Sequence, residues 1–263
     1  MVDDNGLVSV IIPSYNAERL ISETLESVLK QSYKNWEAIV IDDCSRDATQ
    51  QVVKTYAEKD ARIRLIALDK NNGAPAAPRN IGVREARGQW IALLDADDIW
   101  HPRKLELQLK AMAEIKIQFS CTQMQDFSDG ERLAFEEPQE LVYEVIDFQK
   151  QQLKGRIPAS SVILSRELLL SFPFNEETRY KAVEDYHCWL RILQTAGSAV
   201  KLNYPLLRYR KSDEQISRSK MKMLGRVYMV HKEYPRGSVA KAMVFTATHA
   251  IGAFYYRILK RKL

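Results

Sequence analysis

Three carboxylates follow directly on an apolar run in residues 91–100, which read IALLDADDIW. They are Asp95, Asp97 and Asp98. The run before them predicts a strand buried on both faces. Like charges this close repel one another and raise each other's pKa unless a cation lies among them. The stretch alone leaves two interpretations open: a solvated acidic turn that caps a helix, or a site for Mg²⁺ or Mn²⁺, which prefer hard oxygen ligands.

Polar residues also follow three earlier apolar runs. The segments are Pro13-Ser14-Tyr15-Asn16, Asp42-Asp43-Cys44-Ser45, and Asn71-Asn72-Gly73 followed by Arg79-Asn80. If the runs are parallel strands, all these groups lie at one edge of the sheet, where ligands bind. An Asp there can accept from a base or ribose, Tyr15 can pack on a base, and Arg79 can pair with phosphate. There is no GxGxxG and no P-loop, which weakens both of those alternatives.

The first 115 residues alternate between strand and helix patterns, which predicts an α/β fold with a parallel sheet covered by helices. Pro78 falls inside the third helix pattern and predicts that this helix starts late, which leaves the aim of Arg79 open. Beyond residue 115 the alternation is looser. We expect strands at 8–12, 36–41, 63–68, 90–94, 117–121, 161–164 and 198–202, and helices at 17–31, 47–57, 76–86, 102–114 and 183–194.

Composition limits the class of protein. The chain has 263 residues, 46% of them hydrophobic, so it can bury a sizeable core. Its three cysteines lie far apart, which predicts neither a disulfide framework nor a zinc site and fits a reducing cytoplasm. We expect no signal peptide and no membrane-spanning helix. Residues 206–263 carry 14 Lys and Arg against 3 Asp and Glu, while the remainder carries 25 against 31, so the C-terminal region should meet an anionic partner.

The motifs together resemble family 2 glycosyltransferases with the GT-A fold. They are VSVIIPSYN, VIDDCSRDAT, NNGAPAAPRNIGVREARGQWIALLDADDIW and VEDYHCWLRI, in that order. The resemblance covers roughly residues 7–210. It implies a mostly parallel central sheet flanked by helices. It also implies a nucleotide-sugar-binding half at 1–115 and an acceptor-binding and catalytic-base half at 116–210. Beyond them, the charge and the apolar pattern predict a basic, amphipathic helical region at 211–263.

The resemblance also implies a role for each motif residue. Asp185 would be the catalytic base, with Glu184 beside it, although an acidic first turn is also what a helix N-terminus favours. Asp97 would bind Mg²⁺ or Mn²⁺ at the diphosphate, and Asp95 would lie near the metal and the ribose. The remaining donor-site residues would be Asp43 against the base, Pro13 and Tyr15 lining its pocket, and Asn72, Gly73 and Arg79.

Two stretches depart from the family pattern. In residues 74–78, APAAP, such enzymes more often have small residues without the second proline, Pro78. In YRKSDEQIS, residues 209–217, many relatives carry His where this chain has Ser212. Lys211, Arg210 or Arg218 could supply positive charge to the diphosphate instead.

The last 25 residues combine apolar and basic side chains. Aliphatic and aromatic residues from Val239 onward precede Lys260-Arg261-Lys262. This pattern is typical of an amphipathic helix on an anionic membrane. The alternative is a helix packed on the catalytic domain with a solvated basic end.

We therefore expect an inverting glycosyltransferase that is cytoplasmic and peripheral on the inner face of the cytoplasmic membrane. It would move a hexose, from UDP-hexose in the first instance, to a lipid-diphosphate-linked saccharide in bacterial surface polysaccharide (O-antigen-like) biosynthesis. The alternatives are a nucleotidyltransferase that makes sugar nucleotides and a non-catalytic nucleotide- or carbohydrate-binding protein. No nucleic-acid partner is expected.

Overall fold

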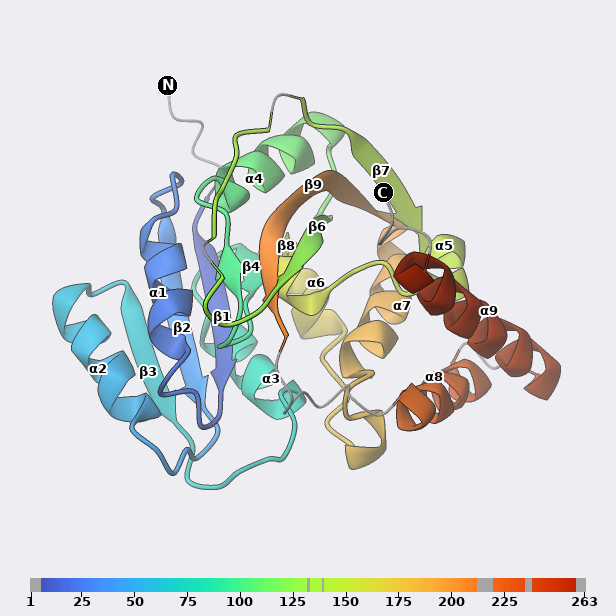
Figure 1. Ribbon diagram of the computed structural model, residues 1–263, viewed down its shortest axis with the longest axis horizontal. Coiled ribbons are helices and arrows are strands. Elements are labelled where there is room, and N and C mark those ends of the chain that lie inside the picture. The colour runs from blue at the N-terminus through green and yellow to red at the C-terminus, as the bar shows by residue number, and fades with distance from the viewer. Residues whose placement is uncertain (1–5, 132, 139, 212–219, 235–237, 259–263) are drawn as a thin grey trace.

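The computed structural model describes residues 6–131, 133–138, 140–211, 220–234 and 238–258 (Figure 1). Its strands are β1 (Val8–Ser14), β2 (Trp36–Asp42), β3 (Ile63–Ala67), β4 (Trp90–Leu93), β5 (Ile99–Trp100), β6 (Phe119–Phe127), β7 (Tyr143–Asp147), β8 (Ile163–Ser165) and β9 (Ser198–Arg210). Its helices are α1 (Ile21–Leu29), α2 (Thr49–Lys59), α3 (Ala76–Glu85), α4 (Lys104–Ile115), α5 (Phe148–Leu153), α6 (Arg166–Ser171), α7 (Glu184–Ala196), α8 (Lys220–Glu233) and α9 (Val239–Ile258), with short 3-10 turns η1 (Ala159–Ser161) and η2 (Thr178–Tyr180).

Within the described residues the strands form one sheet in the order β3-β2-β1-β4-β8-β6-β9-β5, and β7 also pairs with β9. The first four strands in this order are mutually parallel, as their continuous apolar runs predict. The second half is mixed, because β8 runs antiparallel to both β4 and β6 whereas β6 and β9 are parallel. The α/β fold is confirmed, and its sheet is parallel only in the half that carries the first motifs.

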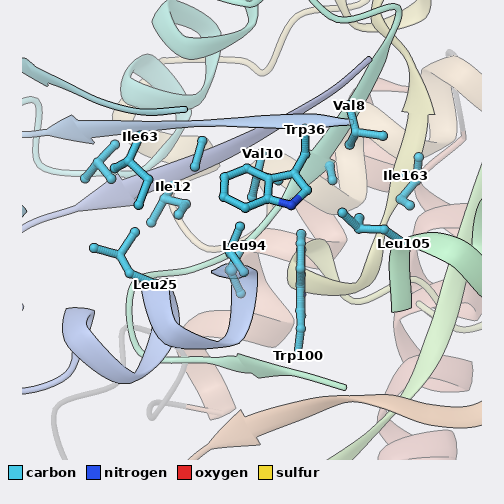
Figure 2. Packing of buried hydrophobic residues seen from close by; sticks show 14 of the residues in the cluster. Val8, Val10, Ile12, Leu25, Trp36, Ile63, Leu94, Trp100, Leu105 and Ile163 are labelled. Carbon is cyan, nitrogen blue, oxygen red and sulfur yellow. The ribbon is translucent and has the colours of Figure 1, made fainter. Parts of the chain in front are cut away.

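Side chains alternate between the two faces of the central strand β1, and each face is covered by helices. On one face Val10 and Ile12 pack with Leu25 of α1 and Leu105 of α4 (Figure 2). On the other face Ile11 packs in a cluster that includes residues of α3 and α7. Burying such an aliphatic side chain stabilises the fold by about 1.5–3 kcal/mol. The strand ends that carry the motifs are therefore held by a well-packed core.

The ends of the expected helices differ from the structure by up to four residues, and two of the helix starts bear on the site. α1 begins at Ile21 rather than at residue 17, because residues 18–20 form a turn. The predicted late start of α3 is wrong, because the helix begins at Ala76 and takes Pro78 into its first turn. Proline is tolerated there, since the first amide groups of a helix have no partner within the helix. Arg79 follows as the first residue to donate back, from its N–H to the Pro75 carbonyl at 2.9 Å.

The C-terminal helices lie beside the second half of the domain, at the right of Figure 1. α9 packs against α8 and α5, and its Ala242 is fully buried. The expected helix over this segment is therefore present, and one of its faces is used for packing. Lys260, Arg261 and Lys262 lie outside the described residues, so their expected basic end is not observed. Among the described helices none is long and apolar enough to cross a membrane.

Candidate active site

The carboxyl ends of the four parallel strands meet at one edge of the sheet, and Asp43 is anchored there. Its buried carboxylate accepts hydrogen bonds from the Asn72 backbone N–H at 3.0 Å and the Asn72 side-chain amide at 2.6 Å. The Asn71 side chain donates to the Asp43 carbonyl at 2.8 Å. The loop after β2 and the loop after β3 are thus joined before any ligand is present.

The loops after β1 and β2 are joined in the same way. The Asn16 N–H donates to the Ser45 hydroxyl, and the Asn16 side chain accepts from the Arg46 N–H, both at 2.9 Å. Asn16 and Cys44 have φ of 50° and 62°, a left-handed conformation that turns the chain sharply. This backbone leaves Tyr15 46% exposed at the sheet edge.

Two other predicted donor-site residues have simpler surroundings. Pro13 is buried within β1 and pairs in register with Ile41 of β2. Gly73 has a φ of +76°, which favours glycine, and lies in the exposed loop before α3.

The acidic loop after β4 is fixed through its backbone. The Asp95 N–H donates to the Ser160 hydroxyl of η1 at 2.8 Å. The Thr24 hydroxyl of α1 lies 3.0 Å from the Ala96 carbonyl and 2.9 Å from the Asp98 carbonyl. The main chain is therefore held from both sides, which sets the directions of the carboxylates.

Arg79 bridges the donor-side motif and the predicted base. One of its terminal nitrogens donates to the Asp95 carboxylate at 2.7 Å, and the other donates to the Glu184 carboxylate at 3.1 Å. The side chains of Arg79 and Glu184 are 4% and 5% exposed, whereas that of Asp95 is 31% exposed. Burial alone would lower the pKa of Arg79, but the two carboxylates outweigh it and raise that pKa. Arg79 is therefore a fully charged link between the loop after β4 and the first turn of α7.

The ionised forms of two carboxylates in the acidic loop are destabilised, as their raised pKa values indicate. Burial, together with the neighbouring Asp95 carboxylate, raises the pKa of Asp97 to about 6. Burial and the charges of Asp97 and Asp95 also raise the pKa of Asp98 well above its usual range. Such clustering fits a functional site better than a solvated turn, whose carboxylates would keep ordinary pKa values.

The predicted base lies at the first turn of α7. Burial and the adjacent Glu184 charge raise the pKa of Asp185 to about 7, although the Arg79 guanidinium and the Tyr186 N–H oppose the rise. One oxygen of Asp185 accepts from that N–H at 2.7 Å. Glu184 is engaged by Arg79, so the two neighbours have different surroundings. Asp185 is the one able to take up a proton near neutral pH.

Tyr186, the residue after the predicted base, connects α7 to the C-terminal helices. Its hydroxyl lies 3.0 Å from Nε2 of His231 on α8. Its ring packs edge-on against His249 of α9, which accepts from the Gly155 N–H at 2.9 Å. Burial lowers the pKa of both histidines, that of His231 to about 4. The contact between α7 and the C-terminal helices therefore contains two imidazoles that are neutral at neutral pH.

The cations expected in place of the family histidine have other partners. Arg210 is buried and pairs with the carboxylates of Glu23 and Asp129, and Lys211 pairs with Asp126. Arg218 and Ser212 lie outside the described residues. Arg210 and Lys211 therefore each have carboxylate partners in the protein. The Lys211 side chain is still 46% exposed, so its contact with a diphosphate stays a prediction.

The acidic loop has the donor chemistry that a hard divalent cation requires. Asp95 and Asp97 supply carboxylate oxygens, and the raised pKa of Asp97 marks negative charge that a cation would neutralise. Among the described residues no three Asp, Glu, His or Cys side chains form a metal cluster by themselves. A cation at Asp95 and Asp97 would therefore take its other ligands from a bound diphosphate and water, as Mg²⁺ commonly does.

Several residues that shape the site were not predicted. Thr24 is a polar residue on the apolar side of an amphipathic helix, and that mismatch was a usable signal. Ser160 lies in a polar segment without a motif, so nothing in the sequence marks it. The Arg79–Glu184 pair joins residues 105 positions apart, and pairing over that separation follows from the fold alone.

Comparison with known proteins gives the same assignment as the motifs. The sequence model of Glycosyl transferase family 2 matches residues 9–170. WfgD of Escherichia coli, a UDP-Glc:alpha-D-GlcNAc-diphosphoundecaprenol beta-1,3-glucosyltransferase, is 37% identical over 242 residues that cover 90% of each chain.

Two solved structures share the fold. TarS 1-349 of S. aureus in complex with UDP-GlcNAc has a TM-score of 0.71 and 22% identity, over 95% of this chain and 73% of that one. The mannosyltransferase PcManGT of Pyrobaculum calidifontis, in complex with GDP-Man and Mn²⁺, has a TM-score of 0.68 and 17% identity, over 97% and 76%. Fold, ordered motifs and sequence relatives agree, and the chain belongs to glycosyl transferase family 2.

Proposed function

We propose that this chain transfers a hexose from a UDP-sugar to a lipid-diphosphate-linked saccharide, with inversion at the anomeric carbon and with a divalent cation. The observation that carries the proposal is the Arg79 bridge. It joins Asp95 at the donor edge of the sheet to Glu184, the neighbour of Asp185, at 2.7 and 3.1 Å. A donor and an acceptor hydroxyl that meet at this edge have a proton acceptor beside them.

Asp185 is the base in this proposal. The acceptor oxygen attacks the anomeric carbon as its proton passes to the Asp185 carboxylate, and the bond from that carbon to the diphosphate oxygen breaks. A single displacement of this kind inverts the configuration. It needs one base and no protein nucleophile, and Glu184 is already engaged by Arg79. The raised pKa of Asp185, about 7, makes it basic enough for the task.

The donor nucleotide would lie over the joined loops after β1, β2 and β3. Asp43 would accept from the base, with Tyr15 and Pro13 lining the pocket and Asn72 and Gly73 forming the adjacent loop. Support comes from the hydrogen bonds between Asp43 and Asn72, which preorganise the edge. A carboxylate has about four lone-pair sites, so the Asp43 oxygens retain capacity for a ligand N–H.

Asp97 and Asp95 are the residues that would hold Mn²⁺ or Mg²⁺. When bound, such a cation supplies positive charge to the departing diphosphate. The repulsion that raises the pKa of Asp97 supports this assignment. The structure of PcManGT, which has a similar fold, was solved in complex with Mn²⁺.

The substrate classes follow from the relatives. The name of WfgD specifies UDP-Glc as donor and a GlcNAc-diphospho-lipid as acceptor, and the chain covers 90% of that protein. A UDP-hexose and a lipid-diphosphate saccharide are therefore the first substrates to test, in a pathway of bacterial surface polysaccharide of the O-antigen type. Membership of the family weighs against the nucleotidyltransferase alternative.

The test is a donor screen with purified full-length chain. UDP-Glc, UDP-Gal, UDP-GlcNAc and GDP-Man would each be incubated with Mn²⁺ and a GlcNAc-diphospho-lipid analogue, and products analysed by mass spectrometry and NMR. We expect one added hexose with the anomeric configuration opposite to that of the donor, and transfer about 10²–10⁴-fold slower with Asp185→Asn. Retained configuration would contradict the mechanism. Tight UDP binding without transfer or hydrolysis would favour the non-catalytic alternative.

The location of the protein is the second part of the proposal, and it concerns the outer face of α9. Ala242 and His249 face inward. Among residues 239–251, whose side chains the structure describes, the exposed ones are apolar apart from Lys241. Met243, Val244 and Ile251 are 59%, 58% and 67% exposed on the side opposite Ala242, and the exposed Ala240 and Ala247 lie on that side too. An apolar helix face within a region that carries an excess of basic residues fits an anionic bilayer surface. We propose that this face lies on the inner surface of the cytoplasmic membrane.

Flotation of the full-length chain with vesicles tests this location. We expect binding to vesicles that contain phosphatidylglycerol and weaker binding to pure phosphatidylcholine. Replacing Met243, Val244 and Ile251 with Ser should reduce the binding. The same three changes at the exposed apolar residues Val142, Val145 and Leu170 serve as the matched control and should not reduce it. Equal loss in both triple variants, or none in either, would contradict the location.

A further inference from the structure

Arg210 at the end of β9 is buried although it carries a permanent charge. Its side chain is 4% exposed, and its guanidinium contacts the carboxylates of Glu23 on α1 and Asp129 in the turn after β6. The guanidinium also lies 4.5 Å from the ring centroid of Phe127. Glu23 and Asp129 are 57% and 73% exposed, so they close over the arginine from the solvent side.

The same residue contacts two consecutive positions of the acidic loop. Nε of Arg210 donates to the Asp97 carbonyl at 2.8 Å. The Arg210 backbone N–H donates to the Asp98 carboxylate at 3.0 Å. Together with Thr24, whose hydroxyl lies on the carbonyls of Ala96 and Asp98, these contacts hold the loop on both sides of Asp97.

Charge argues against Arg210 as a direct ligand of a diphosphate. One guanidinium between two carboxylates forms a cluster with a net charge of −1, which repels phosphate. A buried arginine also stays paired with its carboxylates unless another anion takes their place, because an unpaired buried charge is strongly destabilising. The planar guanidinium can meet two carboxylates and a carbonyl at once, whereas a lysine ammonium cannot reproduce that geometry.

We propose that Arg210 is a positioning residue for the metal-binding carboxylate Asp97. By fixing the Asp97 carbonyl, with Glu23 and Asp129 as its anchors, Arg210 sets the direction in which the Asp97 side chain leaves the loop. Residues that orient a ligand typically change metal affinity 10- to 100-fold when they are altered. This inference rests on the proposed metal-dependent function and adds three residues to it.

The test compares metal affinity in three variants: Arg210→Lys, Glu23→Gln and Asp129→Asn. UDP binding would be measured by calorimetry with EDTA and across a Mn²⁺ series. We expect Arg210→Lys to raise the half-saturating Mn²⁺ concentration about 10-fold or more. The two anchor variants should raise it less but in the same direction. UDP affinity in EDTA should not change, because none of these residues lies at the joined loops that would bind the base.

A direct role on the diphosphate gives the opposite pattern. Glu23→Gln would release the guanidinium toward the ligand and tighten UDP binding, and Arg210→Lys would keep most of the charge and of the metal response. Glu137→Gln, which removes an exposed carboxylate from Arg103, is the matched control and should leave the Mn²⁺ response unchanged.

The outcomes separate this inference from the function on which it rests. If wild-type UDP binding ignores Mn²⁺, both the metal site and the role of Arg210 are refuted. If wild-type binding depends on Mn²⁺ and all three variants respond like wild type, the role of Arg210 alone is refuted. A lowered melting temperature with an unchanged Mn²⁺ response would make Arg210 a purely structural residue, which also refutes the inference.

Discussion

The acid limb of the pH–rate profile should report the ionisation of Asp185. Its pKa of about 7 means that the base is half protonated near neutral pH. From about pH 8.5 to about pH 5.5, the deprotonated fraction falls about 30-fold, because it falls tenfold per pH unit once the pH lies below the pKa. A carboxylate with an ordinary Asp pKa near 3.9 would lose almost nothing over the same range.

The assay is kcat/KM for the acceptor at saturating donor and Mn²⁺, measured at about 25 °C across this range. UDP affinity measured at each pH separates the base from Asp97, whose pKa is raised to about 6. Protonation of Asp97 would weaken donor binding, whereas protonation of Asp185 would slow transfer with the donor still bound.

Two isosteric variants should change the acid limb of the profile in different ways. Glu184→Gln removes the neighbouring charge that raises the pKa of Asp185, so the acid limb should move to lower pH. Asp185→Asn should abolish the limb together with about 10²–10⁴-fold of the rate, the usual contribution of a positioned acid or base. A wild-type profile that is flat down to pH 5.5 would refute the raised pKa. A limb that moves to higher pH in Glu184→Gln would refute the electrostatic explanation.

Three further predictions follow. Asp97→Ala should abolish transfer and Mn²⁺-dependent UDP binding without lowering the melting temperature, since the change removes a repelled carboxylate; full activity in EDTA would contradict this. Asp43→Ala should weaken UDP binding about tenfold both with and without metal, because it frees the Asn72 amide and uncouples two loops; unchanged affinity in calorimetry would contradict it. His231 has a folded pKa of about 4, below its unfolded value near 6.5, so its contribution to stability is present above that unfolded value and is lost as pH falls from about 6.5 to about 4, by up to about 3 kcal/mol. His231→Gln should flatten this part of the urea-unfolding stability profile.

The first half of the fold was predictable because β1, β2 and β4 are buried on both faces. Continuous apolar runs such as residues 91–94 predict such strands, and parallel strands bring their carboxyl ends together. The meeting of Asp43, Asn72 and Asp95 at one edge follows from that topology. The second half was less predictable because β6, β7 and β9 are partly exposed, and mixed pairing leaves no single sequence pattern.

The partners of the charged residues were not predictable. Arg79 was expected to face phosphate, a role that stays a prediction, and the structure places it between two carboxylates from different elements. That geometry depends on where α7 begins relative to α3, which no local pattern encodes. The tail illustrates a related limit. An apolar helix face reads the same whether it packs on protein or on lipid, and α9 packs on protein through the face that carries Ala242.

Arg79 and Arg210, two buried arginines, stabilise different ionised carboxylates of the site. Asp97, Asp98 and Asp185 all have raised pKa values, so their ionised forms destabilise the folded state at neutral pH. Arg79 lowers that cost for the base, and Arg210 lowers it for the acidic loop. Neither arginine removes this cost completely, since the pKa values of Asp97 and Asp185 stay raised beside them. The carboxylates therefore keep the capacity to bind a cation or a proton. The uncompensated negative charge at the edge of the sheet favours binding of a cation and uptake of a proton. The packed core beneath the edge supplies the stability that offsets its cost.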